Sequence, residues 1–107
     1  MTQTLFEQLI TLYIINYLEN YRNAYSLVKI LSRKFDIIDF NRIIDDLIKR
    51  KHVTETVKKQ MGHYTLTIHG ELFLKEHLDE LKKELKETYL PTDPEYMQAI
   101  LSHTAKN

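Results

Sequence analysis

Apolar side chains dominate residues 5–21 and recur at the spacing of a helix. They fall in three adjacent rows, so the predicted helix is apolar around most of its circumference. Its polar positions form one narrow strip, made of Gln8, Thr11 and Glu19. A helix with this much apolar surface is expected to contact neighbours on more than one side.

Two amphipathic helices are predicted after the first. Asn23 is placed as the N-cap of a helix over residues 24–35, whose wetter side carries basic residues. Residues 37–52 repeat the helical period and end in a basic cluster, which suits a helix C-terminus. The predicted inward positions of this third helix are Phe40, Ile43, Ile44, Leu47 and Ile48.

The period then changes from helix to strand. Residues 53–57 are strand-like, and residues 63–68 alternate polar and apolar side chains, as a half-buried strand does. The loop "KKQMGH" between them predicts a hairpin, in which Gly62 is expected to supply a positive φ. Lys58, Lys59 and His63 would then lie at the hairpin tip.

A long fourth helix is predicted to follow the hairpin without a linker. Thr67 is its expected N-cap, although Gly70 stands where a capping box would have Glu or Gln. Leucines spaced four, three and four residues apart form a narrow seam of the kind that pairs with another helix. These leucines are Leu74, Leu78, Leu81 and Leu85.

The sequence divides into a domain and a tail at Pro91, which breaks the fourth helix. Residues 1–89 form the domain, including the long helix. Residues 90–107 form a short terminal helix and tail, with Asp93 as the expected N-cap. The apolar side of that last helix is made of Met97, Ile100 and Leu101.

The composition agrees with one small domain, mainly α with a small β-hairpin. A chain of 107 residues with two glycines and two prolines has a modest core and few tight turns. The absence of cysteine excludes disulfides and thiolate metal sites and fits an intracellular protein. The N-terminus lacks the features of a signal peptide, and no apolar run reaches the ~20 residues of a membrane span. We therefore expect a cytoplasmic protein that does not enter a membrane.

Charge and residue spacing limit the chemistry. Fifteen basic and fifteen acidic residues give no net charge, so any polyanion site must be local. The sequence has no nucleophile elbow and no glycine-rich phosphate loop, so we expect no enzyme activity and no cofactor. The histidines lack the spacing of a zinc site, so no metal is expected. They are His52, His63, His69, His77 and His103.

Three stretches carry a resemblance to a known fold: "AYSLVKILSRKF" (residues 24–35), "IIDDLIKRKHV" (43–53) and "HYTLTIHGELFL" (63–74). The second is similar to the end of a winged-helix recognition helix and the start of its wing. The third looks like the Tyr-x-Leu-Thr-x-x-Gly signature at which the wing returns to a helix. Over residues 5–85 the chain most resembles PadR-type and MarR-like bacterial transcription regulators.

The resemblance implies a winged helix-turn-helix that binds double-stranded DNA as a homodimer. Its third helix would enter the major groove and its wing would contact phosphate or the minor groove. Asn41 and Arg42 would lie in the exposed first turns of the third helix, where Asn pairs with adenine and Arg with guanine. The implied phosphate ligands are Lys29, Arg33 and Lys34 on the second helix and Lys58 and Lys59 on the wing.

The sequence departs from the family pattern in two respects. Lys51 stands where the family usually has the glycine that ends the third helix. Carboxylates surround Arg42 in the sequence: Asp36, Asp39, Asp45 and Asp46. Arg42 is spaced to pair with Asp46 along the helix, and Asp45 is spaced to pair with Lys49. The acidic third helix favours the alternative, a winged-helix protein-interaction module that does not bind nucleic acid.

Aromatic and leucine rows predict how the chain assembles. Tyrosines recur every four residues at Tyr13, Tyr17, Tyr21 and Tyr25, a row that packs against helices or lines a ligand or base site. A single chain would have to expose the first helix or the leucine seam, unless the last helix covers both, so we expect a homodimer through the first and fourth helices. The predicted interface residues are Leu74, Leu78, Leu81, Leu85, Tyr13 and Tyr17.

Overall fold

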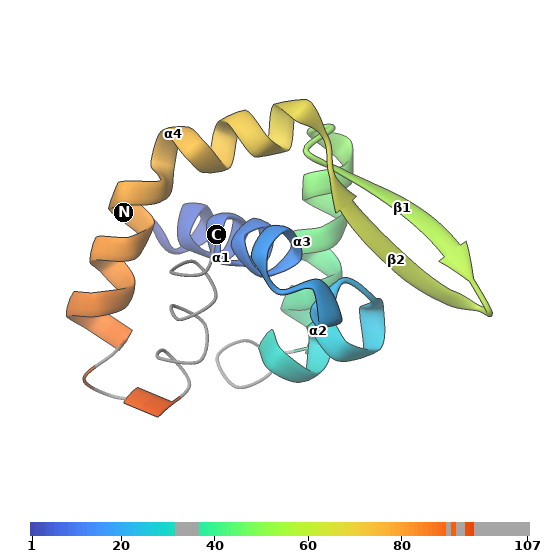
Figure 1. The fold of residues 1–107 in the computed structure, drawn as a ribbon, viewed down its shortest axis with the longest axis horizontal. Coiled ribbons are helices and arrows are strands. Elements are labelled where there is room, and N and C mark those ends of the chain that lie inside the picture. The colour runs from blue at the N-terminus through green and yellow to red at the C-terminus, as the bar shows by residue number, and fades with distance from the viewer. Residues whose placement is uncertain (32–36, 90, 92–93, 96–107) are drawn as a thin grey trace.

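The computed structural model describes residues 1–31, 37–89, 91 and 94–95. It confirms a mainly helical chain with a two-stranded antiparallel hairpin and a long helix after it (Figure 1). The elements are α1 (Gln3–Tyr17), the 3-10 turn η1 (Glu19–Tyr21), α2 (Ala24–Leu31), α3 (Ile37–Lys49), β1 (Val53–Lys58), β2 (Met61–Leu66), α4 (Ile68–Glu84) and the π-helical turn η2 (Leu85–Tyr89). The predicted last helix lies almost wholly outside the described residues.

No helix in the described ranges is long and apolar enough to cross a membrane.

The helix α1 is the centre of the core. It packs against α2, α3 and α4, and α4 arches over it (Figure 1). Every residue from 6 to 15 is buried, so the broad apolar surface predicted for this helix is enclosed by its own chain. The buried positions include polar side chains, namely Glu7, Gln8 and Thr11. The Thr11 hydroxyl donates to the Glu7 carbonyl oxygen at 2.7 Å, which satisfies it inside the helix.

The first helix ends earlier than its sequence period predicts. The prediction of helix through residue 21 is wrong, because Leu18 leaves the helical conformation at φ −109° and ψ 82°. The Arg22 side chain returns to the helix end and donates to the carbonyl oxygens of Ile15 at 2.7 Å and Asn16 at 3.0 Å. A cation on the last carbonyls stabilises a helix C-terminus, so Arg22 fixes where α1 stops.

Side-chain caps begin α2 and α4 as predicted. The Asn23 side-chain oxygen accepts from the Ser26 N–H at 2.9 Å, and the Thr67 hydroxyl accepts from the Gly70 N–H at 3.0 Å. Each cap satisfies one of the free N–H groups of a first helical turn. The polar residues that the sequence offers at these two positions therefore set both helix starts.

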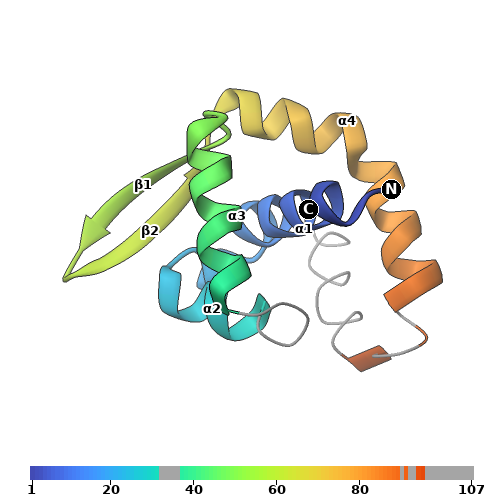
Figure 2. The same cartoon turned by 180° about the vertical axis from the view of Figure 1, so that it is seen from behind.

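The hairpin strands pair in register from Val53 with Leu66 to Lys58 with Met61. Their base is buried through Val53, Tyr64 and Leu66, while the outer part of β1 is exposed. The strand β2 also joins the segment before α2, since the Tyr64 N–H donates to the Arg22 carbonyl oxygen at 2.8 Å. These contacts tie the base to the helices while the rest of the hairpin projects from the body (Figures 1 and 2).

A tight junction connects α3, the hairpin and α4. Lys51 has a φ of 62°, and the His52 N–H donates to the Leu47 carbonyl oxygen at 3.0 Å. This left-handed residue with a backbone bond to the last helical turn is a Schellman helix end, formed here without glycine. The His52 carbonyl oxygen in turn accepts from the Thr67 N–H at 3.0 Å.

Gly70 is required at this junction because there is no space for a side chain. A Cβ on Gly70 would lie 2.1 Å from the His52 carbonyl oxygen, which belongs to the backbone and cannot rotate away. The first turn of α4 therefore packs directly against the end of α3.

Candidate nucleic-acid interface

The hairpin tip carries two of the predicted phosphate ligands. Lys58 and Lys59 are both exposed, and Lys59 with Gln60 forms the two-residue turn. Their φ angles, 51° and 66°, are those of the tight turn that matches the twist of a hairpin. The prediction that Gly62 supplies the positive φ is wrong, because Gly62 lies inside β2 opposite Val57 and no glycine has a positive φ.

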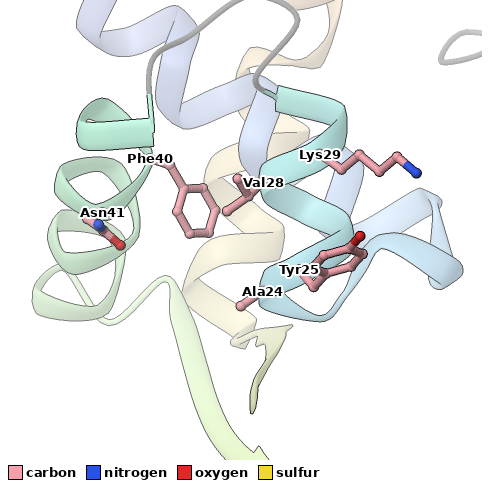
Figure 3. A pocket seen from close by; sticks show the side chains of 6 residues that line it. All are labelled: Ala24, Tyr25, Val28, Lys29, Phe40 and Asn41. Carbon is pink, nitrogen blue, oxygen red and sulfur yellow. The ribbon is translucent and has the colours of Figure 1, made fainter. Parts of the chain in front are cut away.

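A groove runs between α2 and α3 on the outer side of the helices (Figure 3). It has a volume of about 530 Å³ and is lined by Ala24, Tyr25, Val28, Lys29, Phe40 and Asn41. Phe40 and Val28 face one another between the helices, with Tyr25 and Lys29 on the α2 side and Asn41 on the α3 side (Figure 3). Lys29 and Asn41, two predicted DNA ligands, are both exposed and lie on opposite sides of this groove, with the Lys29 side chain directed away from α3 (Figure 3).

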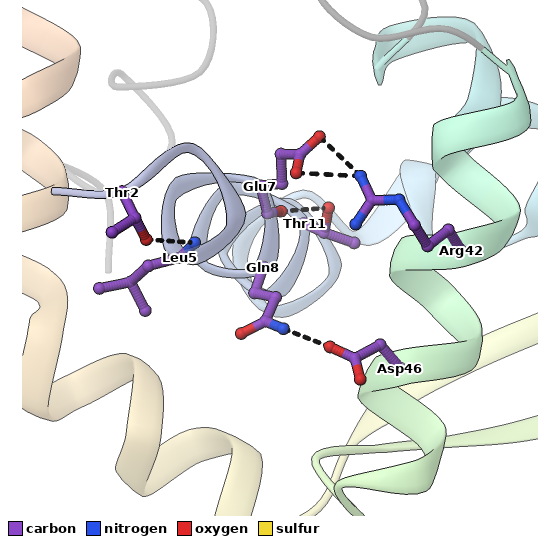
Figure 4. Close-up of polar contacts among 7 residues, drawn as sticks. All are labelled: Thr2, Leu5, Glu7, Gln8, Thr11, Arg42 and Asp46. Carbon is purple, nitrogen blue, oxygen red and sulfur yellow. Dashed lines mark hydrogen bonds and ion pairs between the residues drawn. The ribbon is translucent and has the colours of Figure 1, made fainter.

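Arg42 is oriented by a buried carboxylate from another helix (Figure 4). Its Nη2 atom lies 3.1 Å from each carboxylate oxygen of Glu7 on α1. The Glu7 side chain is 7% exposed and that of Arg42 is 51% exposed, so this contact pairs a carboxylate that is largely shielded from water. The role predicted for Arg42 as a guanine ligand would require it to give up this contact.

The other acidic residues of α3 also differ from the predicted pairing. Asp46 accepts a hydrogen bond from Gln8 on α1 (Figure 4) and pairs with Arg50 Nε at 3.1 Å. Asp46 and Arg42 thus each have another partner, and the predicted pair between them does not form. Among the residues described, no ion pair joins Asp45 to Lys49, and Asp45 is exposed. The described surface of α3 therefore presents the Asn41 amide beside the exposed Asp45 carboxylate. Two further predicted ligands, Arg33 and Lys34, lie outside the described residues.

The residues predicted to form a homodimer interface mostly face inward. Leu74, Leu81, Leu85 and Tyr13 are buried, and Leu78 and Tyr17 are half-buried. Because α4 packs on α1 within one chain, these residues do not form the exposed apolar face on which the homodimer prediction depends, and the homodimer stays a prediction. The large apolar side chains that α4 does expose are Ile68, 74% exposed, and Leu72, 59% exposed.

Histidine side chains gather at the hairpin junction. The ring of His52 stacks on Phe73 with centroids 4.7 Å apart, and Phe73 contacts His77 at 4.8 Å. The Nδ1 atom of His52 is buried and has no hydrogen-bond partner among the described residues. Burial lowers the pKa of His52 below 6.5, and the neighbouring Arg50 and His69 lower it further.

A tyrosine and a glutamate pair across the hairpin. Tyr64 is buried opposite Glu55, and burial together with the hydrogen bond to that carboxylate raises the pKa of Tyr64 to about 12. Glu55 Oε2 would lie 2.7 Å from a Cβ on Gly62, so the second glycine leaves space for this pair. The Tyr64 phenol therefore stays protonated, and its hydrogen bond to Glu55 links β2 to β1.

Tyr25 is a site residue that the sequence pattern does not distinguish from the other tyrosines of its row. It belongs to the tyrosine row that was expected to pack, yet it is 71% exposed and lines the groove while Tyr13 is fully buried. The signal available in the sequence was its spacing of four residues from Lys29, which places both on one face of α2.

Searches against protein-family models, curated proteins and solved structures found nothing that matches this chain.

Proposed function

We propose that the chain is a winged-helix protein that binds double-stranded DNA, acts as a cytoplasmic homodimer and regulates transcription. The observation that carries the proposal is the projecting hairpin (Figure 2), whose tip residues Lys58 and Lys59 are exposed, as are Lys29 on α2 and Asn41 on α3. Lysines on a projecting hairpin suit phosphate contact, and a neighbouring helix pair suits the major groove.

The anchoring of the hairpin supports this function. Backbone bonds join it to Arg22, before α2, and to the start of α4, so its base is fixed relative to α3. A rigid base lets the tip lysines hold one register on a duplex, since phosphate contacts position a protein more than they specify sequence.

The turn residues also favour a role for charge at the tip. Two-residue turns with positive φ prefer Asn-Gly, and this chain has Lys59-Gln60 there instead. A non-glycine residue in the left-handed region costs roughly 1 kcal/mol or more. Lys59 occupies one of these two positions, so the turn places its charge at the projecting end of the hairpin.

Base reading is assigned to Asn41 rather than Arg42. Asn41 is exposed at the first part of α3, whereas the guanidinium of Arg42 is held by Glu7. An asparagine amide can donate to N7 and accept from N6 of adenine, which favours A·T base pairs.

A second function, protein interaction without nucleic acid, is favoured by the acidic surface of α3. Asp45 is exposed on α3, and no cation pairs with it among the described residues. A carboxylate facing phosphates is repelled unless a base donor or cation meets it.

The test is fluorescence anisotropy of a labelled random-sequence duplex at low salt. The double variant Lys58→Ala/Lys59→Ala should bind several-fold more weakly than the wild type, because each lost phosphate contact weakens binding. The matched control is Lys75→Ala/Lys83→Ala, which removes the same charge from exposed positions on α4. Equal losses in both variants, or no binding by the wild type, would reject the proposed DNA interface.

The homodimer is tested separately by light scattering. Because the leucine seam is internal, the exposed α4 residues Ile68 and Leu72 are the proposed contact. Leu72→Asp should convert a dimer to a monomer without unfolding the chain, since that side chain is 59% exposed. A wild-type mass equal to one chain would reject the dimer.

A further inference from the structure

The groove between α2 and α3 differs in chemistry from the rest of the α3 surface. Its lining is apolar or aromatic at four positions, Ala24, Tyr25, Val28 and Phe40. The other two lining residues are Lys29 and Asn41, and no acidic side chain from the described chain lines it. Two acidic positions of α3, Asp45 and Asp46, lie about one helical turn beyond Asn41.

This lining selects an occupant with three properties. It must present apolar surface to Val28 and Phe40, a hydrogen-bonding edge to Asn41, and negative charge near Lys29. A volume of about 530 Å³ is within the range of sites that hold small planar groups. A nucleotide in a DNA strand combines a planar base and a charged phosphate, and thymine adds an exposed methyl group in the major groove.

We propose that this groove seats the 5-methyl group of thymine and makes the protein prefer A·T base pairs. Val28 and Phe40 contact the methyl group, Tyr25 forms the outer wall, and Asn41 hydrogen-bonds a neighbouring adenine. This inference rests on the proposed DNA binding and extends it, because it names the chemical group that is read. Cytosine lacks the methyl group, so a buried methyl distinguishes the two pyrimidines.

The experiment removes only the methyl group. Binding is measured by fluorescence anisotropy at low salt with two duplexes of about 20 base pairs, roughly two helical turns. One is alternating dA and dT, and the other has deoxyuridine in place of every dT. Burying one methyl-sized group is worth a factor of about four in affinity, so the thymine duplex should bind at least about fourfold more tightly.

Variants connect this preference to the groove. Val28→Thr puts a hydroxyl at the methyl contact and should abolish the preference for thymine, with its fold checked by circular dichroism. Tyr25→Ala should weaken the preference without a folding risk, because Tyr25 is 71% exposed. The control Lys75→Ala changes an exposed side chain of α4 that lies outside the groove and should keep the full preference.

The outcomes separate this inference from the function on which it rests. A thymine preference lost in the two groove variants and kept in Lys75→Ala supports it. Salt-sensitive binding that is equal for both duplexes overturns the thymine assignment and leaves DNA binding in place. Groove variants that weaken both duplexes equally also overturn it, because the groove would then contact only the backbone. Failure to bind either duplex rejects the proposed function and this inference together.

Discussion

Gly70→Ala should destabilise the protein far more than the addition of one methyl group usually does. The new Cβ would lie 2.1 Å from the His52 carbonyl oxygen and 2.9 Å from its carbonyl carbon. Relief of this clash must move α4 away from the end of α3. That movement breaks the bond from the Thr67 N–H to His52 and the bond from the Thr67 hydroxyl to the Lys51 carbonyl oxygen, which are 3.0 and 2.6 Å long.

The expected loss follows from three contributions. Overpacking costs about 1–3 kcal/mol, and the two weakened hydrogen bonds cost about 1 kcal/mol each. Alanine recovers about 1 kcal/mol through its higher helix propensity. The net loss in the free energy of unfolding is about 3 kcal/mol, which for a domain of this size lowers the Tm by about 12 °C or more.

The assay is urea unfolding followed by circular dichroism, with Gly62→Ala as the matched control. A Cβ on Gly62 would meet side-chain atoms only, Glu55 Oε2 at 2.7 Å and the Tyr64 hydroxyl at 3.0 Å, and moving Glu55 aside costs about the 1 kcal/mol of its hydrogen bond to Tyr64, so this variant should lose clearly less stability than Gly70→Ala. If Gly70→Ala were as stable as the wild type, or if the two variants lost equal stability, the direct packing of α4 on the His52 backbone would be refuted.

Further predictions concern the helix end, the histidine and the buried ion pair. Lys51→Gly should stabilise the protein by about 1 kcal/mol in urea unfolding because φ is 62° there, whereas Lys49→Gly, at the last residue of α3, should give no such gain and cost up to about 1 kcal/mol. Because burial lowers the pKa of His52, the unfolded chain takes up a proton more readily. Stability should therefore fall as the pH drops below 6.5, level off below the lowered pKa, and depend less on pH in His52→Gln. An unchanged pH profile in that variant would contradict the assignment. Arg42→Ala should cost about 2 kcal/mol by leaving the Glu7 carboxylate buried without its partner. The double variant with Glu7→Gln should recover most of this loss, and no recovery would mean that Arg42 stabilises the fold in another way.

The local elements follow from sequence because they depend on neighbouring residues. Asn23 and Thr67 cap their helices, as their residue types and positions predict. The change in period after α3 also predicts the hairpin. The sequence pattern misplaces the turn because it points to glycine for the positive φ, whereas Lys59 and Gln60 adopt the positive φ angles.

Long-range packing is what the sequence pattern left undetermined. A helical period shows that α1 is broadly apolar, but it does not show that neighbours enclose it and bury Glu7. For the same reason it paired Arg42 with Asp46 on one helix instead of with Glu7 from another. The leucine seam was identified correctly as a helix contact, and its partner includes α1 of the same chain.

The central claim is that the hairpin tip and the α2 edge bind DNA phosphates, and the salt dependence of the binding constant tests it most directly. Three described lysines, Lys29, Lys58 and Lys59, predict a slope of log K against log salt of about −2.7 for each bound chain, at about 0.9 per phosphate contact. A slope of that size or steeper, reduced by about one unit in Lys29→Ala, is the predicted result. A slope near zero, or no binding to duplex DNA at low salt, would contradict it.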